Sequence, residues 1–406
     1  MKPHIYTLDN GIRIVHLPVN SMVAHCGLII GAGSGNEESI EHGLAHFTEH
    51  MFFKGTERRK SYHILSRLED VGGELNAYTT KEETVVHASV LSAHFERAVE
   101  LIHDIVFNST FPTHEIEKEK EVIIEEIKSY RDNPSELIFD DFEGIVFQNH
   151  PLGRNILGTP ETIKEFRKSS ITGFIQKNYS TGRMIFCSAG KMEPGNVFKL
   201  AKKYLESIPE RSFSKTSTPF TGCSGVTVTR NMGTWQNHCI IGNVAYNIYD
   251  RKRLGMFMLN NILGGQGLNS RLNLSLREKN GFAYNIESVY NPYTVTGVFS
   301  IYFGTDKDHL EKSIAITHRE LRKLKENSLG TLQLSRAKNQ IKGYLARGYE
   351  NHENLMLSMG KSLLVFGKIE SLEEVCSKID SIKATELLET ANEIFDTGMI
   401  STLIYK

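Results

Sequence analysis

The stretch His42-Gly43-Leu44-Ala45-His46-Phe47-Thr48-Glu49-His50 is the most informative part of the chain. Its apolar residues recur at helical spacing, which predicts a helix over residues 43–53. Residues four positions apart lie on one face of a helix, so His46 and His50 can both reach a single metal ion. Glu49 lies at the edge of that face, where its carboxylate can contact a water on the metal without binding the metal. This HxxEH order, the reverse of HExxH, indicates a zinc site with a carboxylate base.

A catalytic zinc site needs a third protein ligand and an open position for water. A carboxylate-rich helix is predicted over residues 113–131, and its candidate ligands are Glu115, Glu117, Glu119, Glu121, Glu125 and Glu126. Glu119 and Glu126 are seven residues apart on one face, so they could act together as a ligand and as a partner that supports a ligand. The spacing of these residues does not decide which glutamate binds the metal. Without the first motif, such a charge-rich helix is typical of a solvated face.

The order of predicted elements repeats along the chain, on either side of a linker predicted at residues 209–225, which is rich in Ser, Thr, Pro and Gly. In the first half, strands are predicted at 13–19, 25–30, 74–80, 84–91 and 184–189, and helices at 43–53, 62–71, 94–107, 113–131, 171–179 and 196–205. The second half repeats the pattern, with strands at 239–245, 284–290 and 296–303, a helix starting at 251, another ending near 280, and helices at 309–326 and 332–349. We therefore expect an α+β fold of two homologous α/β-sandwich-like domains, each an antiparallel-rich sheet with helices, at residues 1–212 and 213–406.

Composition argues against several classes of partner and location, although a local basic patch would be compatible with it. The net charge of −1 and the pI near 7 give no support for a nucleic-acid or membrane-surface partner. We expect no membrane span and no secretory signal, because the chain has no long apolar run and its N-terminus has no apolar region. Its five cysteines are scattered and odd in number, without CxxC spacing, which predicts no disulfide framework and favours a reducing cytoplasm.

Four runs carry a resemblance to a known family: GLAHFTEHMFFKGT at 43–56, GGELNAYTTKEETV at 72–85, EIEKEKEVIIEEI at 115–127 and GLNSRLNLSLREKNGFAY at 267–284. The sequence resembles the pitrilysin-type zinc metallopeptidases, also called inverzincins. Within that family it is similar to the short forms, the mitochondrial processing peptidase β-subunit and the bacterial processing peptidases. The resemblance covers both halves of the chain and implies a mitochondrial processing peptidase-like fold.

The resemblance also implies roles for particular residues. Glu126 is the expected third zinc ligand, beside His46 and His50, and Glu119 is the expected carboxylate supporting the site. The resemblance implies one zinc ion per chain. Glu49 is expected to be the general base that acts on the zinc-bound water. The substrate would pair with an edge strand carrying Asn76, Ala77 and Tyr78, and Arg277 and Tyr284 would hold the substrate carbonyl group.

The expected function is therefore a zinc-dependent endopeptidase acting on peptides or unfolded segments inside a closed chamber. Family members of this length pair up, so the resemblance implies a homodimer whose active sites combine the zinc site of one protomer with Arg277 and Tyr284 of the other. Two alternatives are a catalytically silent structural or binding subunit and a metal hydrolase that does not cleave peptides. The intact set of His46, Glu49, His50 and Glu126 argues against the first. The sequence does not distinguish a processing peptidase, which cleaves at a defined site, from a scavenging oligopeptidase.

Several other residues receive a structural interpretation. His42 is expected at the entry of the helix, away from the metal. The run Gly264-Gly265-Gln266-Gly267 lacks the Gly-Lys-Ser/Thr ending of a phosphate-binding loop. Without the resemblance, Arg277 would be an ordinary surface residue. Apolar runs surround three further histidines, which are expected to be core or strand residues: His87, His103 and His238.

Overall fold

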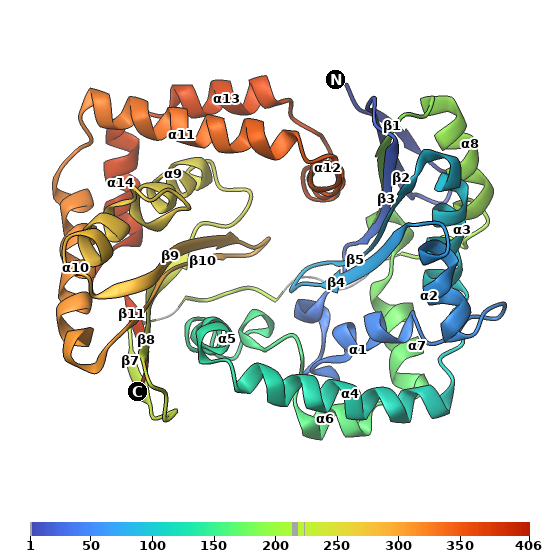
Figure 1. The fold of residues 1–406 in the computed structure, drawn as a ribbon, viewed down its shortest axis with the longest axis horizontal. Helices are drawn as coiled ribbons and strands as arrows, with labels where there is room; N and C mark the ends of the chain where they lie inside the picture. The colour runs from blue at the N-terminus through green and yellow to red at the C-terminus, as the bar shows by residue number, and fades with distance from the viewer. Residues whose placement is uncertain (1, 213–217, 223) are drawn as a thin grey trace. The chain divides into compact units, whose positions relative to one another are not determined.

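The computed structural model describes residues 2–212, 218–222 and 224–406. These residues form two compact units, each built on one sheet with helices on both faces (Figure 1). The α+β fold with two domains is confirmed. Part of the predicted linker at 209–225 lies outside the described residues, as does Cys223, and the other four cysteines are free. Among the described residues, no helix is long and apolar enough to cross a membrane.

The first unit contains a six-stranded sheet in the order β1-β2-β6-β3-β5-β4. All neighbouring strands are antiparallel except β2 and β6, which are parallel. In sheet order the strands are β1 (His4–Thr7), β2 (Arg13–Pro18), β6 (Met184–Gly190), β3 (Val23–Ile30), β5 (Thr84–Leu91) and β4 (Glu74–Thr79). The segment with the Asn76, Ala77 and Tyr78 triplet therefore lies on an edge strand, β4.

One face of this sheet is covered by helices of the first half of the chain, which enclose the largest apolar core. They are α1 (Leu44–Met51), α2 (Ser61–Glu69), α3 (Phe95–Phe107), α4 (Thr113–Arg131), α6 (Pro160–Glu165), α7 (Lys168–Asn178) and α8 (Pro194–Leu205). The opposite face is covered by α12 (His352–Phe366), whose Met356 and Leu363 are buried against β2, β3 and β6. This helix lies close to the sheet because it carries Gly360, where a Cβ atom would lie 2.6 Å from Ile29 Cδ1.

The second unit contains a five-stranded sheet in the order β7-β11-β8-β10-β9. Its strands are β7 (Thr227–Arg230), β11 (Ser401–Tyr405), β8 (Asn237–Ala245), β10 (Gly297–Thr305) and β9 (Ala283–Pro292). Its helices are α9 (Arg253–Gly264), α10 (Leu310–Glu326), α11 (Thr331–Tyr349), α13 (Leu372–Ser381) and α14 (Ala384–Ile394), with a π-helical segment at Asn273–Glu278. Here the helix from the other half of the chain is α5 (Pro134–Val146), which packs on β8 and β11.

The two units repeat one topology, as the sequence predicts. In each sheet the parallel pair (β2 with β6, β7 with β11) is followed by the same run of antiparallel neighbours, ending on an edge strand (β4, β9). The boundaries of the two units differ from those of the predicted domains, 1–212 and 213–406. The reason is that each half of the chain contributes one segment to the unit formed mainly by the other half. Residues 128–154 belong to the second unit and residues 347–370 to the first, so α5 and α12 each cover the sheet of the other half.

Candidate metal centre

Helix α1 begins at a tightly packed turn that fixes its direction. Gly43 precedes it with a φ of +94°, a conformation that side chains rarely adopt. A Cβ atom on Gly43 would also lie 2.7 Å from the Gly158 Cα atom. The buried carboxylate of Glu37 accepts hydrogen bonds from the backbone N–H groups of Gly43 (3.0 Å) and Ala45 (2.8 Å). These contacts satisfy donors that a helix start leaves unpaired, and an anion there is favoured by the helix dipole.

The three predicted ligands lie together in the first unit, with His46 buried and Glu126 partly exposed. His46 Nε2 is 3.8 Å from Glu126 Oε1, and His50 Nε2 is 3.8 Å from Glu126 Oε2. One ligand atom from each residue lies within 4.8 Å of the others, and no other such group occurs among the residues searched, those the structure describes. Zinc bonds of about 2.0–2.2 Å place tetrahedral ligand atoms about 3.3–3.5 Å apart, so the three side chains must draw closer together to hold zinc.

His50 is oriented by a buried carboxylate on its far side. Its Nδ1 lies 2.7 Å from Glu119 Oε1, and the other Glu119 oxygen lies 2.5 Å from Lys54 Nζ. Burial alone would raise the pKa of Glu119, but the hydrogen bonds from His50 and Lys54 outweigh it and lower that pKa. The ionised Glu119 carboxylate can only accept a hydrogen bond, so His50 donates to it from Nδ1. In the neutral imidazole that binds a metal, the lone pair is then on Nε2, the nitrogen that lies towards Glu126.

His46 is held in its neutral form by burial. Desolvation, reinforced by the neighbouring His50 ring, lowers its pKa to about 3 against the opposing effect of Glu119. A neutral imidazole retains the lone pair with which histidine binds metals. Its Nδ1 is buried and has no hydrogen-bond partner in the described part of the chain, unlike that of His50. Packing and its T-shaped contact with the His50 ring, 4.5 Å between centroids, hold this side chain in place.

Glu49 lies beside the cluster but is not one of its ligands. Its carboxylate is buried, and Oε2 accepts a hydrogen bond of 2.6 Å from the Thr79 hydroxyl. Burial raises the pKa of Glu49 and Glu126 adds to the effect, while the Thr79 hydrogen bond and His50 oppose it. A buried carboxyl group that lies next to a possible metal site, without belonging to it, is placed to transfer protons there.

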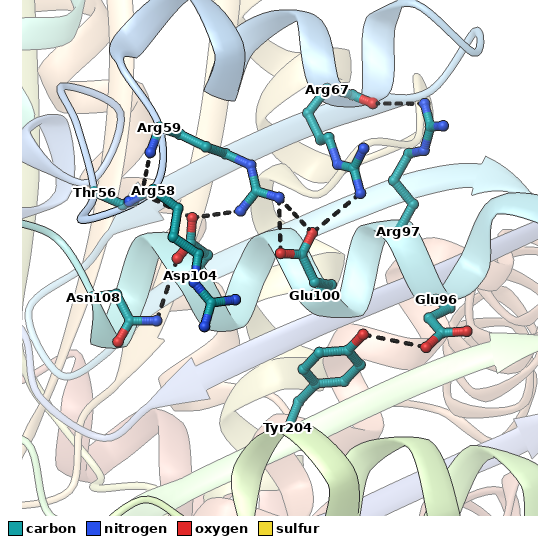
Figure 2. A network of polar contacts seen from close by, with 10 residues as sticks. All are labelled: Thr56, Arg58, Arg59, Arg67, Glu96, Arg97, Glu100, Asp104, Asn108 and Tyr204. Carbon is teal, nitrogen blue, oxygen red and sulfur yellow. Dashed lines mark hydrogen bonds and ion pairs between the residues drawn. The ribbon is translucent and has the colours of Figure 1, made fainter.

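The loop that follows α1 is tied to helix α3 by an ion-pair network (Figure 2). The Arg59 guanidinium donates to both oxygens of Glu100, at 2.8 and 2.9 Å, and to Asp104 at 2.5 Å. The Thr56 hydroxyl also donates to Asp104, which is almost fully buried. Because its two terminal nitrogens bind two different carboxylates of α3, the Arg59 guanidinium resists rotation, and the network fixes the segment that carries Lys54.

The other predicted site residues lie outside the cluster. Tyr78 packs with the apolar group under α12, on the sheet face opposite to that of Ala77. Arg277 and Tyr284 belong to the second unit, on the π-helical segment and the edge strand β9, and the Tyr284 side chain is 79% exposed. His42 contacts the Asn155 carbonyl oxygen through Nε2 at 2.7 Å, at the entry of α1.

Three residues at the site were not predicted: Glu37, Lys54 and Thr79. A signal for Thr79 exists, because it follows the predicted Asn76-Ala77-Tyr78 strand on the alternating pattern of β-residues. Glu37 and Lys54 lie in loops, where the spacing of residues in the sequence does not predict which side chains meet.

Comparison with known proteins decides the family. The sequence model of Insulinase (Peptidase family M16) matches residues 15–160, and that of the Peptidase M16 inactive domain matches residues 165–341. The chain belongs to peptidase family M16. The cluster of His46, His50 and Glu126 lies in the part matched by the first of these two models, and Arg277 and Tyr284 lie in the part matched by the second. The resemblance to the pitrilysin-type peptidases is thereby confirmed.

Relatives in the M16 family align over nearly the whole chain. An uncharacterized zinc protease of Rickettsia bellii is 36% identical over 99% of this chain and 97% of its own length. The uncharacterized zinc protease YmxG of Bacillus subtilis is 32% identical over 98% and 97%. The fold matches the crystal structure of a protease from Helicobacter pylori, with a TM-score of 0.90 and 23% identity over 100% of this chain and 99% of that one. The M16 family is one of zinc-dependent peptidases, in agreement with the predicted cofactor.

Proposed function

We propose that this chain is a zinc-dependent endopeptidase in which His46, His50 and Glu126 bind the metal and Glu49 is the general base. One observation carries the proposal: the Glu49 carboxylate is buried beside the three ligand atoms without being one of them. A metallopeptidase needs this division, because a carboxylate bound to the metal is a weaker base than one that is free of it. Membership of the M16 family and the names of the relatives support zinc and peptide substrates.

The chain's own groups divide the work of hydrolysis. Zinc, when bound at a site of this kind, lowers the pKa of a water towards 7 and polarises a carbonyl group. Glu49 accepts the proton of the attacking water and delivers it to the leaving amine. The same carboxyl group can perform both transfers because it is not one of the metal ligands. Glu119 keeps the His50 ring in the orientation and tautomer that metal binding needs.

The substrate is an extended peptide that pairs with β4. This strand lies at the edge of the first sheet and packs against α1, so its backbone groups face outward close to the cluster. Addition of a peptide strand to such an edge gives affinity through main-chain hydrogen bonds. In this arrangement Asn76, Ala77 and Tyr78 bind the substrate backbone. A processing role and a cytoplasmic location stay predictions.

A catalytically silent subunit is the second candidate. It is favoured by one finding, the match of residues 165–341 to a domain described as inactive. That match concerns the half without the ligand group, whereas the group itself lies within the other matched range, 15–160. The absence of catalysis therefore fits the second half of the chain better than it fits the whole chain.

Digestion of a peptide library, read by mass spectrometry, separates the two candidates. We expect the zinc-loaded protein to cleave unfolded peptides, a chelator to abolish cleavage, and added zinc to restore it. Cleavage at one sequence pattern would indicate a processing peptidase, and cleavage at many patterns a scavenging one. Zinc-loaded protein that leaves every peptide intact would favour the silent subunit.

We also propose a homodimer with composite active sites in a closed chamber. Arg277 and Tyr284 lie in the second unit, and Tyr284 is largely exposed. Exposed cationic and phenolic groups can stabilise a developing oxyanion. In the proposed dimer they act on a substrate carbonyl bound at the partner's zinc site.

Mixing two inactive variants tests this arrangement. Glu49→Gln and Tyr284→Phe proteins should complement each other once their subunits exchange, because one site of each mixed dimer carries both defects and the other carries neither. Random exchange makes half of the dimers mixed, so activity should return to about a quarter of the parental value. If a fluorescence label proves exchange and no activity returns, the trans arrangement is wrong and the metal assignment is unaffected.

A further inference from the structure

Among the described residues, the Glu49 carboxylate has one side-chain hydrogen bond, and it comes from another element. The Thr79 hydroxyl, at the end of β4, donates to Glu49 Oε2 at 2.6 Å. Such a short bond from a hydroxyl to a carboxylate belongs to the strong, charge-assisted class. The other carboxylate oxygen of Glu49, Oε1, is not bonded to Thr79.

The alternation of β4 places the Thr79 side chain on the correct face. Leu75 and Ala77 pack against the core that lies beneath α1, whereas Tyr78 packs on the opposite face of the sheet. Side chains two residues apart share a face of a strand, so Thr79 points towards α1 together with Leu75 and Ala77. The contact with Glu49 therefore follows from the register of the strand.

The backbone around Thr79 is held on both sides. Thr79 pairs with Thr84 of β5, whose hydroxyl is itself bonded to the Ala32 carbonyl oxygen at 2.9 Å. The next residue, Thr80, closes a tight turn through its backbone N–H, which donates to the Glu83 carbonyl oxygen at 2.8 Å. A hydroxyl on such a fixed backbone has little freedom to move away from its acceptor.

We propose that Thr79 is a positioning residue for the general base: it holds Glu49 Oε2 so that Oε1 faces the attacking water. The inference rests on the proposed function, since it needs Glu49 to be the base. It also assigns a second task to β4, because the strand that pairs with the peptide backbone is the same strand that orients the base. Correct pairing of the peptide and correct orientation of Glu49 are thereby linked through one rigid segment.

Thr79→Val tests the proposal, because valine keeps the shape of threonine and removes the hydroxyl. We expect kcat to fall by roughly 10- to 100-fold, the effect typical of a hydrogen bond to a charged group, with KM and zinc content near the parental values. Thr79→Ser retains the hydroxyl and should restore most of the activity. Thr48→Val is the matched control: it removes a buried hydroxyl next to Glu49 that donates to the Leu44 carbonyl oxygen instead, and kcat should change little.

Three results would overturn the inference. They are a Thr79→Val kcat close to the parental value, an equal loss in Thr79→Ser, and a loss of activity that parallels a loss of zinc or of thermal stability. Glu49→Gln, measured alongside, keeps this failure separate from that of the proposed function. An inactive Glu49→Gln with a fully active Thr79→Val refutes only the role of Thr79, whereas an active Glu49→Gln refutes the base itself.

Discussion

Glu49→Gln is expected to lower kcat by about 100- to 10,000-fold, the range typical for loss of a general base, while zinc content stays at the parental level. Glutamine has nearly the same shape as glutamate and can still accept a hydrogen bond from Thr79, but it cannot take a proton from water. Steady-state cleavage of a fluorogenic peptide, with metal analysis of the same preparation, measures both quantities.

The control for this variant is Glu121→Gln, which removes an exposed carboxylate on α4, the helix that carries Glu126. It should leave kcat and zinc content unchanged, because the carboxylate lies outside the ligand group. Turnover by Glu49→Gln close to that of Glu121→Gln would mean that another residue is the base.

Much of the candidate site could be predicted because two of its ligands lie on one helical turn. The spacing of His46 and His50 places them on one face of α1, and that inference needs no knowledge of the rest of the fold. Glu126 is different, since it comes from α4 and six glutamates of that helix had suitable chemistry. Only the resemblance singled it out, and the geometry around it agrees with that choice.

The contacts that support the site were harder to predict because they join distant segments. Glu37 reaches the start of α1 from a loop, and Thr79 reaches Glu49 from a strand thirty residues away. Hydrophobic periodicity reports which face of an element is buried, but not which polar group of another element that face meets.

The exchange of α5 and α12 between the halves was also beyond the sequence. A signal for α5 was available, since Asn133 followed by Pro134 is typical of a helix start. The sheet on which such a helix packs depends on the path of the chain, and an apolar face such as that of Ile138 and Phe142 suits either sheet. A prediction of two domains, each one continuous stretch of sequence, cannot describe this exchange of helices.

His50→Ala is expected to abolish both zinc binding and peptide cleavage. The change removes one of three protein ligands and leaves Glu119 and Lys54 without the imidazole between them and the cluster. The loss of activity should be at least as large as in Glu49→Gln, because no metal remains to act on the substrate. Circular dichroism of the variant should match the parent, since the side chain lies at the surface of the first unit and is 24% exposed.

Zinc content per chain, measured by mass spectrometry of purified parent, Glu49→Gln and His50→Ala proteins, separates the metal ligands from the general base. We expect about one zinc per chain in the parent and in Glu49→Gln, and none in His50→Ala. Full zinc in His50→Ala, or loss of zinc in a folded Glu49→Gln, would contradict the division between the residues that hold the metal and the residue that acts on water.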